Sequence, residues 1–157
     1  MYIPSVLRIG ARRSLPVALA LCLLPVAAGA QDVLTEASPK KITKILTSMG
    51  LEIQETKGES DQPIFKFDLA GYQVLLILAK DHTDAQLYVG FGGRQVSTDK
   101  VNEWNARHRF GRAYRDKDGE PVLESDIDFT GGVTEANIKA WVKLFRDLMG
   151  SYSKFVH

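Results

Sequence analysis

The chain has 157 residues, with 20 basic and 19 acidic side chains and a formal net charge of +1 at pH 7. This balance does not support a strongly basic surface of the kind by which many proteins bind nucleic acid, so no nucleic-acid partner is expected. The length suits one domain with its own apolar core, and the single cysteine cannot form an internal disulfide.

The first 30 residues have the three parts of a secretory signal. Three arginines precede an apolar run over residues 15–26, and small residues follow it up to Ala30. The run is shorter than the roughly 20 residues that cross a bilayer, so we expect a signal peptide cleaved after Ala30 rather than a membrane anchor. Arg12 and Arg13 leave twin-arginine export open beside the general secretory route. The mature protein would be periplasmic or secreted, with 17 basic and 19 acidic side chains and a net charge of −2.

Residues 31–37 are expected to be a flexible linker that leads into a domain of residues 38–157. A helix is predicted from Pro39 to Met49, because Ser38 can cap it, proline suits its first position and apolar residues recur at helical spacing. Four strands in an antiparallel meander are predicted to follow, over Leu51–Thr56, Ile64–Leu69, Tyr72–Ala79 and Gln86–Phe91.

The third of these strands contains an unbroken apolar run over residues 74–78. A strand with one wet face should alternate instead, so both of its faces are predicted to be covered. The chain offers only three predicted helices, two of them short. We therefore hypothesise that a second copy of the chain, or a protein or peptide partner, completes part of this apolar surface.

A second helix is predicted from about Asp99 to Arg107, with Trp104 as its core anchor. Asn102 and Asn105 bracket the tryptophan, and several arginines follow. These residues could bind an acidic or carboxylate-bearing ligand. The simpler interpretation is that they cap the helix end and the turn beside it.

The next two strands are predicted to form a hairpin. With Asp118 and Gly119 as a two-residue turn, Tyr114 faces Leu123, and one face of the hairpin is apolar while the other is charged. A three-residue turn with a bulge at Gly119 would shift every pair by one residue and set Phe110 against an aspartate. We therefore favour the first register.

The charged face of this hairpin is a second candidate site. Glu124, Asp126 and Asp128 share one strand face, with Arg109 predicted opposite Asp128. The carboxylates could bind a hard cation or a small ligand, which would make the protein a sensor. The simpler interpretation is a solvated face balanced by cross-strand ion pairs. Together with the helix end, the candidate binding residues are Asn102, Trp104, Asn105, Arg109, Arg112, Glu124, Asp126 and Asp128.

The final helix is predicted from Glu135 to Phe155, because large apolar residues fall in one arc of a helical projection. The element order is therefore α-β-β-β-β-α-β-β-α, which predicts the α+β class with an antiparallel sheet. No nucleophile motif, metal-binding histidine spacing or cofactor loop is recognised, so neither an enzyme nor a cofactor is expected.

Several segments together resemble the YbjN family of bacterial proteins, described as sensory transduction regulators. The likeness covers nearly all of residues 38–156 and is carried by residues 67–72, 101–105, 109–114, 118–124 and 131–134. The resemblance implies a fold like that of type III secretion chaperones, an α+β unit that often dimerises and holds partner polypeptides, and it brings no catalytic residues. The predicted export signal departs from the common family member. The leading hypothesis is thus a non-catalytic periplasmic protein-binding or peptide-binding module, and the alternative is the ligand or cation sensor.

Overall fold

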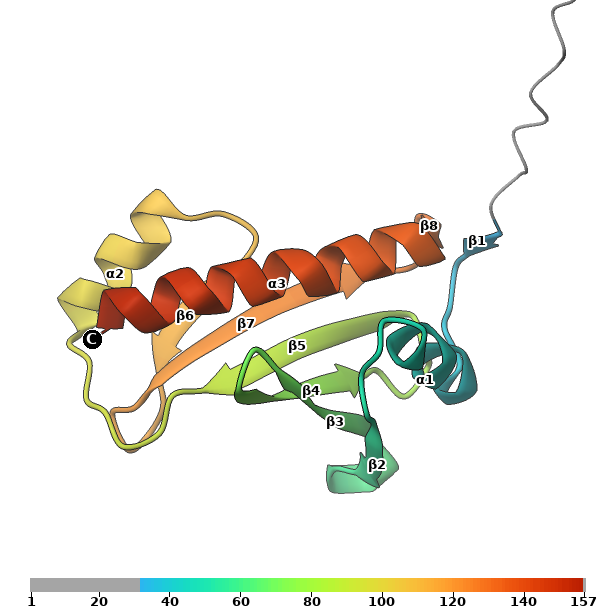
Figure 1. The fold of residues 1–157 in the computed structure, drawn as a ribbon, viewed down its shortest axis with the longest axis horizontal. Helices are drawn as coiled ribbons and strands as arrows, with labels where there is room; N and C mark the ends of the chain where they lie inside the picture. The colour runs from blue at the N-terminus through green and yellow to red at the C-terminus, as the bar shows by residue number, and fades with distance from the viewer. Residues whose placement is uncertain (1–31, 157) are drawn as a thin grey trace, which may run out of the picture.

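The computed structural model describes residues 32–156, so the predicted signal peptide lies outside the described residues. The predicted α+β class with an antiparallel sheet is confirmed (Figure 1). No helix within residues 32–156 is both long and apolar enough to cross a membrane. In chain order the elements are β1 (Val33–Leu34), α1 (Pro39–Thr47), β2 (Gln54–Lys57), the short 3₁₀ helix η1 (Glu59–Asp61), β3 (Pro63–Leu69), β4 (Tyr72–Leu78), β5 (Asp84–Gly90), α2 (Thr98–Arg107), β6 (Arg112–Arg115), β7 (Pro121–Asp128), β8 (Val133–Thr134) and α3 (Glu135–Val156).

The main sheet has six strands in the order β2-β3-β4-β5-β7-β6, and neighbouring strands run antiparallel. The predicted meander from β2 to β5 is confirmed. The structure adds a small second sheet, in which Val33 of β1 pairs with Thr134 of β8. Ala37 is fully buried, and its amide donates a hydrogen bond of 2.9 Å to the carbonyl of His82. Val33, Leu34 and Ala37, which lie within the expected linker of residues 31–37, thus have defined contacts.

All three α-helices lie on one side of the main sheet (Figure 1). The longest, α3, runs along the sheet over β5 and β7, while α1 packs against α3 and α2 packs against β6. This layer encloses the apolar core, in which Trp104 is 1% exposed, as its predicted role as core anchor requires. The side of α3 that faces the core carries most of the predicted arc, namely Ile138, Trp141, Val142, Phe145, Leu148, Met149 and Tyr152.

The other side of the main sheet carries no α-helix of the described residues (Figure 1). In β4 the burial alternates, because Val74, Leu76 and Leu78 are buried under the helices while Leu75 and Ile77 are only half-buried. The expectation that both faces of this strand are covered is therefore not met within residues 32–156. The unbroken apolar run therefore places some side chains on the face that the helices cover and the others on the face that has no covering layer.

The predicted hairpin register is wrong by one residue. Tyr114 pairs with Val122, and Ala113 pairs with Leu123. The amide of Asp116 donates to the carbonyl of Glu120, which leaves a three-residue loop ending in Gly119 at a φ of 80°. This is the bulged turn that the sequence analysis set aside.

Hydrogen bonds of two side chains stabilise the longer turn. The side-chain amide of Gln95 donates to the carbonyl of Asp118, and Asp116 Oδ1 accepts the amides of Asp118 and Glu120. The unfavourable pairing of Phe110 with an aspartate, expected for this register, does not form. Phe110 lies outside β6, has a φ of 67° and is 66% exposed. The register thus follows from contacts that strand alternation does not encode.

An aromatic cluster fills the core between α2 and α3. The ring centroids of Trp104 and Tyr152 lie 4.9 Å apart, and Phe91 meets Tyr152 edge-on at 5.4 Å. Trp104 Nε1 and Tyr152 Oη are buried and have no hydrogen-bond partner among the described residues. Burial raises the pKa of Tyr152 to about 12.

Replacing Tyr152 by phenylalanine should raise the free energy of unfolding by about 1 kcal/mol at pH 7, because it removes a buried hydroxyl without a partner. The variant should also lose less stability in alkali. As the pH rises from about 10 to about 12, the unfolded state releases the phenolic proton of Tyr152 while the folded state keeps it, so the parent protein is destabilised there. Urea unfolding at pH 7, 10 and 11 measures both effects, and an unchanged alkaline slope would contradict the assignment.

Candidate functional site

The side of the main sheet without helices is the first candidate surface, and it is called the open face below. Its side chains form two neighbouring rows across the strands. One row runs through Lys66, Leu75, Tyr88, Glu124 and Arg112, and the other through Ile64, Ile77, Gln86 and Asp126. Between its charged members the open face therefore presents half-buried aliphatic and aromatic groups from neighbouring strands.

Glu124 is buried on this face although no helix covers it. Its Oε2 pairs with the guanidinium of Arg112, and its Oε1 accepts a hydrogen bond of 2.6 Å from the hydroxyl of Tyr114. Burial and the hydrogen bond to Glu124 raise the pKa of Tyr114, so its hydroxyl stays protonated and remains a donor. Burial, with the charges of Asp116 and Glu124, also raises the pKa of Tyr88. Both carboxylate oxygens of Glu124 are thus already engaged.

The other hairpin carboxylates do not converge with Glu124 on a common point. Asp126 Oδ1 accepts a hydrogen bond of 3.0 Å from Gln86, and Asp128 Oδ1 accepts the amide and hydroxyl of Thr130. In the ladder Asp128 faces Asp84 rather than the predicted Arg109. Within residues 32–156 no group of three or more histidine, cysteine, aspartate or glutamate residues is placed to hold a metal ion.

Arg109 lies outside β6, and its guanidinium carbon is 5.4 Å from the ring centroid of the exposed Phe110. Among the predicted hairpin-face residues, the structure thus brings Arg112 and Glu124 together and leaves Arg109 apart from them. No ion pair joins Arg109 to a described carboxylate. Its predicted cross-strand partnership with Asp128 is wrong, because the chain leaves the ladder before reaching it.

The candidate residues at the end of α2 have mainly structural positions. Trp104 lies in the core, and Asn102 is exposed on the outer side of the helix. The side chain of Asn105 donates to the carbonyl of Ala113 and accepts its amide, both at 2.9 Å. Asn105 therefore occupies, at Ala113, the position that a further strand would take beside β6. At Ala113 it blocks the addition of another strand to this edge of the sheet.

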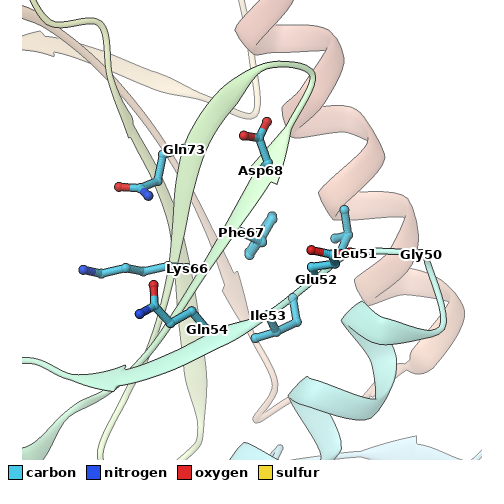
Figure 2. A pocket seen from close by; sticks show the side chains of 9 residues that line it. All are labelled: Gly50, Leu51, Glu52, Ile53, Gln54, Lys66, Phe67, Asp68 and Gln73. Carbon is cyan, nitrogen blue, oxygen red and sulfur yellow. The ribbon is translucent and has the colours of Figure 1, made fainter.

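The opposite edge of the sheet is split. The last pair between β2 and β3 joins Gln54 to Lys66, whereas β3 continues beside β4 as far as Leu69. Residues 51–53 diverge from β3 and leave a hollow of about 590 Å³. Figure 2 shows Lys66 and Gln73 pointing away from this segment and Phe67 pointing toward it.

A second hollow of about 560 Å³ lies on the helix side of the same edge and is called the basic cleft below. It is lined by Ser48, Met49, Leu51, Asp68, Leu69, Ala70, Lys139, Val142, Lys143 and Arg146. Sequence reasoning singled out none of these residues as a site. The spacing of Lys139, Lys143 and Arg146 along one helix was the available signal, but it could not reveal what lies opposite them.

Comparisons with known proteins support the family and the fold. Residues 38–157 match the sequence model of the YbjN family, "Putative bacterial sensory transduction regulator". The type III secretion chaperone SycH of Yersinia pestis, solved in complex with a stable fragment of YscM2, aligns with a TM-score of 0.51 and 14% identity. The alignment covers 69% of this chain and 93% of that one, and at this identity it shows the fold alone. No curated protein matches the chain.

Proposed function

The chain belongs to the YbjN family, and from this we propose that it is a non-catalytic module that binds another protein through its open face. The observation that carries the proposal is the helix-free side of the sheet, where half-buried Leu75 and Ile77 lie beside Tyr88. Apolar and aromatic groups that remain partly in water favour association, because burying them against a partner releases that water. The similar chaperone was crystallised with a protein fragment, which agrees with a partner of this class.

A polypeptide partner fits the open face better than a small molecule does. The described hollows lie at the β2 edge of the sheet, beside α1 and next to β1, and none is lined by Leu75, Ile77 or Tyr88. Small ligands usually occupy concave sites, whereas a broad face suits another folded surface. A second copy of this chain could cover the same face, so a homodimer is the competing form of the proposal. The sensor alternative has less support, because Glu124, Asp126 and Asp128 are each engaged within the chain.

We also propose that the protein acts in the periplasm or outside the cell. The support is the order of residues 1–30, in which arginines are followed by an apolar run and then by small residues, as in a secretory signal. Under this proposal the mature chain begins at Gln31, and its open face meets other exported proteins. The binding experiment is therefore made on the full chain expressed with its own N-terminus.

The test places a photo-crosslinking phenylalanine analogue at Ile77 on the open face and, as a control, at Leu144, which is 37% exposed on α3. Irradiated periplasmic extract should give one recurring adduct from the Ile77 position and none from Leu144, and the adduct should contain a mature chain starting at Gln31. The partner identified by mass spectrometry is then purified and titrated. A folded Ile77→Lys variant should bind it at least about tenfold more weakly, because a charge replaces an apolar contact.

Unchanged affinity of the folded Ile77→Lys variant would overturn the proposal. An adduct formed only between copies of the chain would assign the open face to a homodimer instead. A product that remains cytoplasmic with residues 1–30 attached would overturn the proposed location while leaving the binding result to be judged separately.

A further inference from the structure

The basic cleft lies apart from the open face. Its walls are the C-terminal end of α1, the turn between β3 and β4, and one side of α3. Leu69 and Val142 belong to the helix-covered side of the sheet and are buried, whereas the open face lies on the other side. A ligand in the cleft would therefore leave Leu75, Ile77 and Tyr88 of the open face free.

The floor of the cleft is apolar and needs no polar partner. Met49 and Leu51 are half-buried there, beside Leu69 and Val142. The end of α1 satisfies its own last carbonyls, since those of Lys44, Ile45, Leu46 and Thr47 all accept hydrogen bonds from the residues that follow. A ligand thus finds apolar contact at the helix end rather than unmet backbone acceptors.

One wall of the cleft is positively charged. Lys139, Lys143 and Arg146 follow one another at intervals of four and three residues, which places them along one side of α3. Lys139 pairs with Glu135 at 2.8 Å, and Arg146 pairs with its exposed neighbour Asp147 at 3.2 Å. Lys143 has no ion pair or side-chain hydrogen bond among the described residues.

Asp68, the one acidic residue that lines the cleft, forms no ion pair with this wall. Asp68 Oδ1 accepts a hydrogen bond of 3.1 Å from the amide of Gly71 and so holds the turn between β3 and β4. Because Glu135 and Asp147 already pair with Lys139 and Arg146, Lys143 is the cation of this wall that has no carboxylate partner among the described residues. The charge that complements this cleft is negative, and the apolar floor beside it selects against a bare inorganic anion.

We propose that the basic cleft binds an acidic polypeptide segment, whose carboxylate meets Lys143 and Arg146 while a neighbouring apolar side chain rests on Met49 and Leu51. The proposal rests on the proposed function, because it assigns a class of partner to a protein-binding module. An extended segment fits because the basic cleft and the hollow of Figure 2 share Leu51 and Asp68 in their linings, so together they continue along the split sheet edge.

The experiment measures the fluorescence anisotropy of labelled synthetic peptides titrated with the folded protein. The probe is a short peptide in which leucine, serine and glutamate recur, and the matched control has lysine in place of glutamate. The acidic peptide should bind saturably and more weakly as salt rises, and the lysine peptide should not bind. Lys143→Glu should weaken binding at least about tenfold, whereas Lys154→Glu, about three turns farther along α3, should leave it unchanged.

Several outcomes would overturn the proposal. These are no saturable binding of the acidic peptide, equal binding of the two peptides, or a folded Lys143→Glu variant that binds like the parent. Displacement of the peptide by octanoate at comparable concentration would assign the cleft to a small carboxylic acid instead. An adduct at Ile77 without peptide binding defeats only the cleft proposal, while peptide binding without that adduct defeats only the role of the open face.

Discussion

Replacing Trp104 by alanine should lower the free energy of unfolding by about 3 to 5 kcal/mol, the range found when a buried aromatic side chain is truncated. Trp104 is 1% exposed. Its ring stacks on His108 at a centroid distance of 3.5 Å and also contacts Tyr152 and Phe155. The substitution therefore opens a cavity where α2 and α3 meet.

Urea denaturation followed by circular dichroism measures this loss, and Trp141 remains as a fluorescent reporter of the core. Phe110→Ala is the matched control, because Phe110 is also aromatic but 66% exposed, and it should change stability by less than about 0.5 kcal/mol. A loss below about 1 kcal/mol for Trp104→Ala would mean that the tryptophan is exposed in solution. It would then become a candidate for binding.

Asn105→Ala should cost about 1 to 3 kcal/mol and should also expose an edge of the sheet. The substitution removes both hydrogen bonds to Ala113 and leaves its backbone amide and carbonyl without a partner. Urea unfolding gives the stability change, and light scattering reports any new association through β6.

Asn102→Ala serves as the control, since Asn102 lies on the same helix, is exposed and makes no side-chain hydrogen bond to a described residue. Asn105→Asp should still accept the amide hydrogen bond of Ala113 but can no longer donate to the carbonyl of Ala113. Its free energy of unfolding should therefore lie between those of the parent protein and Asn105→Ala. If Asn105→Ala were as stable as Asn102→Ala, the edge-sealing role would be wrong.

The periodic elements could be predicted from the sequence because their signals are local. The apolar arc of α3 and the cap at Ser38 depend on neighbouring residues, and both are present in the structure. Strand alternation did not give the hairpin register. The register depends on the side-chain hydrogen bonds of Asp116 within the turn, and on Gln95, which lies outside the hairpin and reaches the carbonyl of Asp118.

The candidate sites show the same limit. Arg112 and Glu124 were both singled out, yet their pairing depends on the shifted register, which sets them directly opposite each other. The basic cleft was missed altogether. Its walls come from α1, from the turn after β3 and from α3, and only the fold brings Met49 and Lys143 to the same cleft. Spacing along the chain carries no information about such a meeting.

The two edges of the main sheet differ in whether a further strand can be added to them. Asn105 closes the β6 edge at Ala113, while β2 pairs only with β3 among the described strands. A further strand could therefore add beside β2, whereas Asn105 stands in its way beside β6 at Ala113. If two copies joined through their β2 edges, each would use the other's available edge, so assembly would stop at the pair and could not propagate into a fibre.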